Sequence, residues 1–207
     1  PSWDLSLVLD SLQFPPFESL GEVDLKFLSL KTFFLVAISF GRHLGELGAL
    51  SHRYPYCRVF DDRVILVLLP SFVPKINSPF HKNQEIVLPH FFPDPSCDED
   101  RLLHSLDVRR ALLIYLERVA SFRVSEALFM NFGPVEKGGK SVTSSLSRWV
   151  RSLISLAYES KGLPVPGGIH CRSTRSMSSS VAELQGASII VHCTLCAYKK
   201  LGQLNRS

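Results

Sequence analysis

The sequence predicts an α+β fold that is mainly helical and contains a small antiparallel sheet. Two long stretches, residues 22–40 and 143–160, place apolar side chains at helical spacing. Between them, residues 63–69 are rich in β-branched side chains and are bounded by two aspartates and a proline, a pattern typical of a strand. With 207 residues, 45% of them hydrophobic, the chain is long enough for one large domain with its own core.

The first half is expected to begin with helices. Residues 4–12 form a short amphipathic segment that ends before a pair of prolines. Residues 22–40 predict a longer and mostly buried helix, which Gly41 ends. Residues 42–50 then predict a second helical piece.

The predicted sheet lies in the middle of the chain. Residues 63–69 are one strand, residues 74–79 are rich in turn formers, and residues 84–92 return as a second strand. An acidic linker that contains proline follows over residues 94–100, and residues 127–132 predict one more short strand. The first two strands are therefore expected to form a hairpin.

Helices dominate the second half. Asp107 is a side chain that commonly caps a helix N-terminus, so a helix is expected directly after it. A glycine pair at 138–139 predicts a turn, and residues 164–168 an extended loop. The expected helices cover residues 107–120, 143–160, 173–184 and 187–197.

The charge is unevenly distributed along the chain. Residues 137–207 carry a net charge of +8, whereas residues 1–136 carry a net charge of −4. Such a basic region is typical of a surface that faces a polyanion. The alternative is that these cations lie on the exposed faces of ordinary basic helices.

Cysteine usage and hydropathy exclude two classes of protein. The five cysteines are scattered and odd in number, which argues against a secreted disulfide framework and favours the cytosol or the nucleus. The longest apolar run, residues 33–40, is far too short to span a bilayer. No signal peptide is recognisable. We therefore expect no membrane partner.

The segment with the most chemical information is residues 169–180, where Arg172 and Arg175 stand among hydroxyl side chains. A spacing of three residues places both guanidiniums on one face of a helix. The segment also opens a predicted helix, whose free backbone N–H groups favour an anion. This pattern predicts a phosphate socket, and the alternative is a solvated, serine-rich basic loop.

The order of short motifs along the chain resembles one known family, the catalytic domain of tyrosine recombinases, in particular those of DIRS-type retrotransposons of animals. The resemblance extends from residue 1 to about residue 198 and includes residues 1–5, 28–32 and 119–123. Its main motifs are Leu47-Gly48-Ala49-Leu50-Ser51, Phe72-Val73-Pro74-Lys75, Ser173-Thr174-Arg175 and Gly186-Ala187-Ser188-Ile189.

The resemblance implies DNA strand exchange through a covalent 3′-phosphotyrosyl link, without a metal or any other cofactor. In that family two arginines neutralise the reacting phosphate. A lysine on a β-hairpin is the general acid, two further side chains contact the phosphate, and a tyrosine near the C-terminus is the nucleophile. By position, Arg175 matches the second arginine and Lys75 matches the hairpin lysine.

The other catalytic positions differ from the family pattern. The first arginine falls on His43, with Arg42 one residue earlier. One residue along a helix rotates a side chain by about 100°, so Arg42 takes this role only if the helix start is re-registered. His43 can hydrogen-bond a phosphate but is mostly neutral at pH 7. The histidine of the family's His-x-x-Arg falls on Arg172, which keeps a positive charge but does not shuttle protons.

The nucleophile position is altered as well. Tyr198 is the one late tyrosine, and it falls where the family has histidine or tryptophan. The family's tyrosine would come about ten residues after Tyr198 by the resemblance, just beyond Ser207. Tyr198 is therefore a candidate nucleophile in an unusual position, and the alternative is an aromatic side chain that packs at a helix end. These differences favour a decayed or truncated copy of a mobile element, in which cleavage is impaired.

We expect a single tyrosine-recombinase-like domain over residues 1–207. Residues 1–20 are expected to be a linker or helix that leads in from a preceding N-terminal domain, and residues 199–207 a divergent or truncated tail. The expected partner is double-stranded DNA in the nucleus, after synthesis in the cytoplasm, with self-association on the DNA and no small-molecule substrate. The predicted catalytic residues are Arg42, His43, Lys75, Arg172, Arg175 and Tyr198.

Three alternative interpretations stay open. The first is a zinc site at His192, Cys193 and Cys196, although one C-x-x-C on a predicted helix is weak evidence and the resemblance places apolar helix positions there. The second is a non-catalytic relic that binds DNA through its basic half. The third is a protein-interaction role, with aromatic contacts at residues 14–17 and 91–92.

Overall fold

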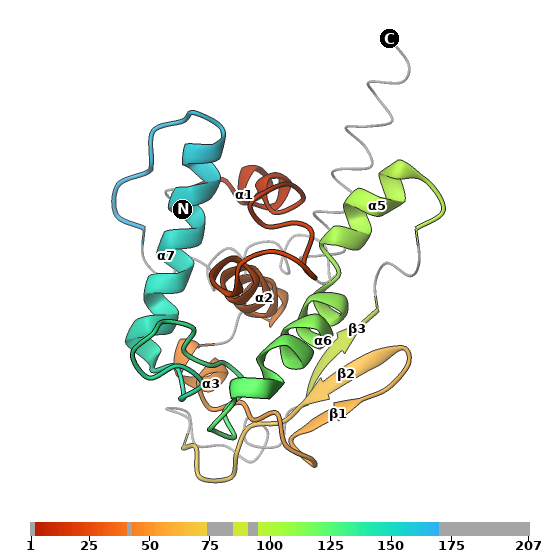
Figure 1. The fold of residues 1–207 in the computed structure, drawn as a ribbon, viewed down its shortest axis with the longest axis vertical. Coiled ribbons are helices and arrows are strands. Elements are labelled where there is room, and N and C mark those ends of the chain that lie inside the picture. Colours follow the sequence, from red (N-terminus) through yellow and green to blue (C-terminus); the bar gives the residue numbers. More distant parts are fainter. Residues whose placement is uncertain (1–2, 41–42, 74–84, 91–94, 170–207) are drawn as a thin grey trace.

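The computed structural model describes residues 3–40, 43–73, 85–90 and 95–169, and these have an α+β fold (Figure 1). The sheet is small, and helices supply most of the core. The predicted fold class, mainly helical with a small antiparallel sheet, is confirmed at this level. The elements are α1 (Leu5–Ser11), α2 (Leu25–Phe40), α3 (Leu44–Leu47), β1 (Cys57–Val59), β2 (Arg63–Leu66), β3 (Ile86–Pro89), α5 (Asp98–Ser105), α6 (Val108–Val119), the 3-10 turn η1 (Ala120–Phe122) and α7 (Thr143–Ser160).

Helix α2 lies in the middle of the helical part, with α6 on one side and α7 on the other (Figure 1). It is apolar on nearly all sides, as expected of a helix surrounded by other elements. The Phe33 ring meets Phe129 and Trp149 edge-on, with ring centroids 4.9 and 5.8 Å apart. Such aromatic pairs tie the central helix to α7 and to the loop before it.

Helices α6 and α7 cover α2 with amphipathic faces, as the sequence predicts. The Asp107 carboxylate accepts a hydrogen bond from the Arg110 backbone N–H at 2.7 Å, which confirms the predicted cap. The inward face of α7 includes Leu146, Trp149 and Leu153, all buried. No helix in the described ranges is long and apolar enough to cross a membrane.

The sheet has the strand order β1-β2-β3, and both pairs are antiparallel. Leu66 of β2 stands opposite Cys57 on one side and Ile86 on the other, and all three are buried on the core face. The predicted hairpin is therefore present, with strands shorter than expected. Strand β1 was not predicted, because a three-residue strand is too short to show an alternating pattern.

Two other predictions about the middle of the chain are wrong. Residues 127–132 form no strand, because their backbone groups pair singly with different segments, at Ala127 with Ser51 and at Met130 with Lys140. The expected linker over residues 94–100 instead contains the start of α5. Its acidic first turn is stabilised by the N-terminal end of the helix dipole, so an acidic run here continues into a helix.

Residues 3–20 pack into the same core as the later helices. Trp3, Phe17 and Leu20 are all buried, and the Phe17 ring meets Phe27 edge-on with centroids 5.7 Å apart. The interpretation of residues 14–17 as an external aromatic contact is therefore wrong for Phe17, which the core encloses. Phe14 is exposed, and the second predicted contact, at 91–92, lies outside the described residues.

Candidate functional site

The described part of the chain contains one of the predicted catalytic residues, His43. The two arginines, the hairpin lysine, the late tyrosine and the residues considered for zinc lie outside it, at Arg42, Lys75, Arg172, Arg175, Tyr198, His192, Cys193 and Cys196. Within the described ranges, no group of three His, Cys, Asp or Glu side chains could hold a metal ion.

His43 occupies the cap position of α3 and its side chain is exposed. Its backbone N–H faces the Glu46 carboxylate at 3.3 Å, and its carbonyl accepts from the Glu46 backbone N–H at 2.9 Å. These reciprocal bonds fix the start of the helix. The imidazole is thereby presented at the protein surface from a defined backbone position.

The helix expected over residues 42–50 is shorter than predicted. It begins at Leu44, and Gly48 is its C-terminal cap. His43 therefore precedes the helix, and the rotation of about 100° per residue does not apply at this position. The position of His43 relative to the predicted phosphate therefore cannot be derived from the rotation between successive residues of a helix.

The chain after β2 turns back along α3. Leu68 bridges to Leu50, and the Leu69 N–H donates to the Ala49 carbonyl at 3.4 Å. The Phe72 ring then lies over Gly45, 3.9 Å from the position that a Cβ would take there. A Cβ at position 45 would be in ordinary van der Waals contact with the ring, so Phe72 packs beside this turn of α3 without requiring a glycine there.

This contact has a consequence for the predicted site. Phe72 stands three residues before Lys75, and Gly45 stands two residues after His43. Strands β2 and β3 are paired, so the connection between them, which contains Lys75, joins two neighbouring antiparallel strands. The structure thus brings the beginning of the lysine-bearing connection against the helix that His43 caps.

Helix α3 also packs against the first turns of α7, where Leu146 lies 3.5 Å from the position of a Cβ on Gly48. The opposite, solvent-facing side of α7 carries Arg148 and Arg151, both exposed. Their spacing of three residues puts them on one side of the helix, with Ser144 and Ser152 one turn before and after Arg148. This set, which we call the α7 basic face, combines cations with hydroxyl donors.

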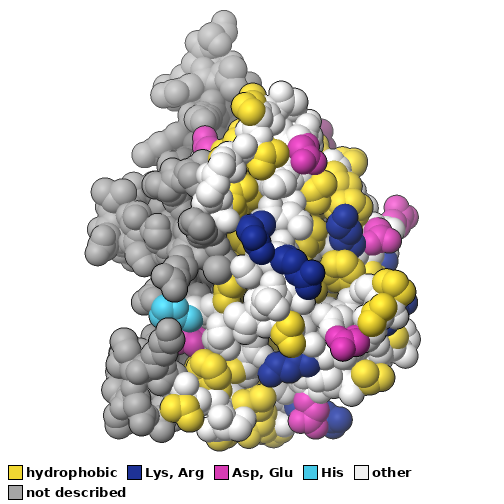
Figure 2. Space-filling model, turned by 90° about the vertical axis from the view of Figure 1, so that its left-hand side faces the viewer, with side chains coloured by type: hydrophobic (Ala, Val, Ile, Leu, Met, Phe, Trp, Pro, Cys, Tyr) yellow, Lys and Arg dark blue, Asp and Glu magenta, His cyan; other side chains and the backbone are white. Residues whose placement is uncertain are grey.

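In the part of the chain that the structure describes, the cations of the α7 basic face have few partners. Arg148 donates to the Ser145 hydroxyl at 3.1 Å, and neither Arg148 nor Arg151 forms an ion pair within the described ranges. Figure 2 views the molecule from the α7 side and shows Lys and Arg side chains near the middle of this face. Exposed cations without carboxylate partners are what a polyanion requires.

Arg123, within one of the segments that resemble the family, has a different role. Its guanidinium donates to the carbonyls of Ala127 and Leu128, and burial lowers its pKa. Burial also lowers the pKa of His52, and the neighbouring Arg123 and Arg53 add to this effect. Arg123 therefore holds the loop before α7 in place and is not available to a ligand.

Sequence reasoning did not single out the contact of Phe72 with Gly45 or the α7 basic face. The first joins residues 27 apart along the chain, and no local pattern signals it. The second had a signal, since the two arginines of the predicted helix stand at i and i+3 and avoid its apolar stripe.

No family model, no curated protein and no solved structure matches this chain. The relation to tyrosine recombinases stays a prediction from the sequence motifs.

Proposed function

We propose that this chain is a tyrosine-recombinase-like domain whose reaction, impaired in this copy by its altered catalytic positions, breaks and rejoins double-stranded DNA through a phosphotyrosyl link. The observation that carries the proposal is the contact of Phe72 with Gly45. It places the start of the connection that contains Lys75 beside the helix that His43 caps, so Phe72 of one motif lies next to the helix that ends with Leu47, the first residue of another.

The proposed reaction follows from the resemblance. The hydroxyl of a tyrosine, with Tyr198 as the candidate in this chain, loses its proton to solvent as its oxygen attacks the phosphorus of a DNA phosphodiester, and the bond from phosphorus to the 5′-oxygen breaks. Lys75 gives its proton to the leaving 5′-oxygen, while Arg172 and Arg175 neutralise the charge on the phosphate. Attack by a 5′-hydroxyl on the phosphotyrosine reverses these steps and rejoins DNA. An element that integrates into chromosomes in this way acts in the nucleus.

The α7 basic face supports the DNA partner. Arg148 and Arg151 are exposed and lack carboxylate partners in the described part of the chain, and Lys140 is an exposed cation shortly before the helix. Each phosphate that such a side chain neutralises releases counterions, so binding weakens as salt is added. This contribution is independent of sequence and positions the duplex.

The experiment that tests the proposal is covalent trapping on nicked duplexes that lose a short 5′-ended fragment after cleavage. We expect a protein–DNA adduct on a denaturing gel, lost in Arg175→Ala and in Tyr198→Phe. Lys26→Ala removes an exposed lysine on α2 and serves as the control that keeps the adduct. An adduct that persists in Arg175→Ala, or no adduct at all, would contradict the proposed reaction.

A second candidate function is DNA binding without cleavage. It is favoured by His43, since the structure presents an exposed imidazole where the family pattern has arginine. The variant His43→Arg separates the two functions. If it produces or increases the adduct, the remaining machinery is competent and the histidine limits the rate. If DNA binding is intact and neither wild type nor His43→Arg forms an adduct, the chain is a binding relic.

A further inference from the structure

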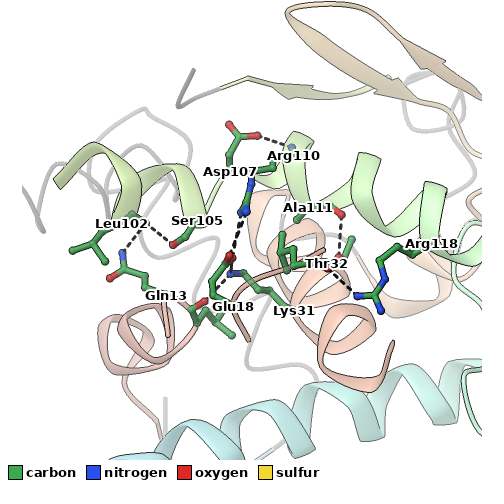
Figure 3. Close-up of polar contacts among 12 residues, drawn as sticks. Gln13, Glu18, Lys31, Thr32, Leu102, Ser105, Asp107, Arg110, Ala111 and Arg118 are labelled. Carbon is green, nitrogen blue, oxygen red and sulfur yellow. Dashed lines mark hydrogen bonds and ion pairs between the residues drawn. The ribbon is translucent and has the colours of Figure 1, made fainter. Parts of the chain in front are cut away.

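The segment between α1 and α2 is attached to the rest of the molecule by the buried side chains of Leu12, Phe17 and Leu20 and by polar contacts of side chains. We call residues 12–20 the N-terminal strap. Within the described part of the chain, the hydrogen bonds between its backbone groups and other backbone groups are all local. Side chains make the links to α2, α5 and α6 (Figure 3). At one end, Gln13 donates to the Leu102 carbonyl at 3.2 Å, and at the other, Arg118 of α6 donates to the Leu20 carbonyl at 2.9 Å.

The middle of the strap is held by one carboxylate between two cations. The Lys31 ammonium of α2 donates to Glu18 at 2.5 Å and to the Leu12 carbonyl at 2.6 Å. From the other side, the Arg110 guanidinium of α6 reaches both oxygens of Glu18, at 3.2 and 3.3 Å. Figure 3 shows Glu18 between these two side chains.

This cluster carries one more positive charge than negative charge when all three groups are ionised. The Lys31 side chain is fully buried, while Glu18 and Arg110 are 16% and 21% exposed. A buried charge is costly unless it is paired, and here two cations share one partner. The charged groups that act on Lys31 are Glu18 of the strap, which favours its protonated form, and Arg110 of α6, which disfavours it.

We propose that the N-terminal strap is a proton-sensitive element, held most firmly on α2 and α6 when the Lys31 amine is neutral. A neutral amine can still donate to the Leu12 carbonyl and to Glu18, and it leaves Glu18 and Arg110 as a balanced pair. Protonation restores the excess charge inside the protein, and opening of the strap relieves it by exposing Lys31 to water.

The direction of the effect follows from linkage. Burial, opposed by Glu18, lowers the pKa of Lys31 from 10.5 to about 8 in the closed state. When the strap opens, the amine regains the ordinary value and binds a proton more readily. Between about pH 8 and pH 10.5 the open state thus holds more protons, so the closed state gains up to about tenfold in population for each pH unit.

The test is hydrogen exchange of the strap amides on the millisecond scale from pH 7 to pH 10, read by mass spectrometry and corrected for the intrinsic exchange rate. In the wild type we expect protection of residues 12–20 to be level up to about pH 8 and then to rise by up to tenfold per unit. Lys31→Met removes the titrating amine, so its profile should be flat. Lys26→Met, an exposed lysine on the same helix, is the matched control and should keep the wild-type rise.

A second variant keeps the test decisive if Lys31→Met does not fold. Glu18→Gln leaves both cations without a carboxylate, so strap protection at pH 7 should fall below that of the wild type. Loss of the carboxylate lowers the pKa of Lys31 further, so the rise of protection should begin at a lower pH than in the wild type. A wild-type profile that is flat or falls with pH would overturn the proposal. So would a Lys26→Met profile that loses the rise.

Discussion

The cations around the N-terminal strap and those of the α7 basic face are the same residue types in opposite surroundings. Lys31, Arg110 and Arg118 point inward, and their side chains donate hydrogen bonds to Glu18 and to backbone carbonyls. Arg148 and Arg151 point outward, and within the described ranges neither meets a carboxylate. A lysine or arginine that is bound to a carboxylate or a carbonyl within the protein supports the fold, whereas one without such partners is available to a ligand. The net charge of the surrounding segment does not determine which of the two roles a given cation has.

The distinction corrects an interpretation based on net charge. Residues 1–136 are acidic overall, yet Lys31 is buried in the core, and the partly buried Arg110 and Arg118 bind Glu18 and backbone carbonyls. Residues 137–207 are basic overall, and in their described portion the α7 arginines stay in solvent. Segment charge alone therefore did not identify the cations that hold the strap, and it does not separate buried from exposed cations, since Lys26, Arg53 and Arg101 of the acidic segment are exposed as well.

The largest expected effect on stability comes from removing the carboxylate that pairs with the buried cations. Glu18→Ala leaves Lys31 and Arg110 without their carboxylate, and loss of one partner of a buried ion cluster costs about 3–5 kcal/mol of the free energy of unfolding. Denaturant unfolding measures it. Glu22→Ala, which removes an exposed carboxylate nearby, should change stability by less than about 0.5 kcal/mol. Equal effects of the two variants would refute a structural role for the cluster.

Three buried groups should shape the pH dependence of global stability at alkaline pH. The pKa of Lys31 is lowered to about 8, so between pH 8 and 10.5 the unfolded chain holds more protons at this group, which contributes a rise of up to about 1.4 kcal/mol per unit. Burial raises the pKa of the Cys57 thiol, and this group opposes the rise above pH 9. Burial raises the pKa of Tyr115 to about 12, so above pH 10 the folded state holds more protons and stability falls. Lys31→Met should remove the rise and Tyr115→Phe should weaken the fall, as urea titrations at several pH values would show.

Arg123 extends the comparison to a cation of intermediate burial. Arg123→Ala removes the donors to the Ala127 and Leu128 carbonyls and should cost about 1–3 kcal/mol in unfolding free energy. DNA affinity should change little once the protein is folded, because this guanidinium is already engaged. A selective loss of DNA binding with unchanged stability would place Arg123 with the α7 basic face instead.

Periodic elements were predicted from the sequence, and elements that depend on tertiary contacts were not. Helix α7 spans the predicted residues because its apolar stripe is regular over five turns. The strand expected over residues 127–132 failed because its hydrogen bonds go to separate segments. An apolar run has the same pattern whether or not a partner strand is present, so sequence alone does not settle this case.

The predicted site was accessible to sequence reasoning only as a set of motifs. The resemblance placed His43 and Lys75 in one site, and the fold adds the contact of Phe72 with Gly45, which joins the two segments. The sequence predicted His43 inside a helix, whereas His43 is the residue that caps α3. In a helix as short as α3, the cap and the first turn have similar residue preferences, so the boundary between them was not predictable. Residues distant along the chain meet through packing, and no local pattern encodes that.

The smallest expected change in stability is that of a variant of the α7 basic face, and this variant is also the most informative about DNA binding. The double variant Arg148→Ala/Arg151→Ala removes two exposed side chains of α7 and should alter the free energy of unfolding by less than about 0.5 kcal/mol each. Both candidate functions require that the chain binds double-stranded DNA, so the decisive measurement is the Kd for a duplex at several salt concentrations. We expect weaker binding and a slope of log affinity against log salt that is shallower by about two than in the wild type. No salt-dependent binding by the wild type, or an unchanged slope in the double variant, would contradict the account.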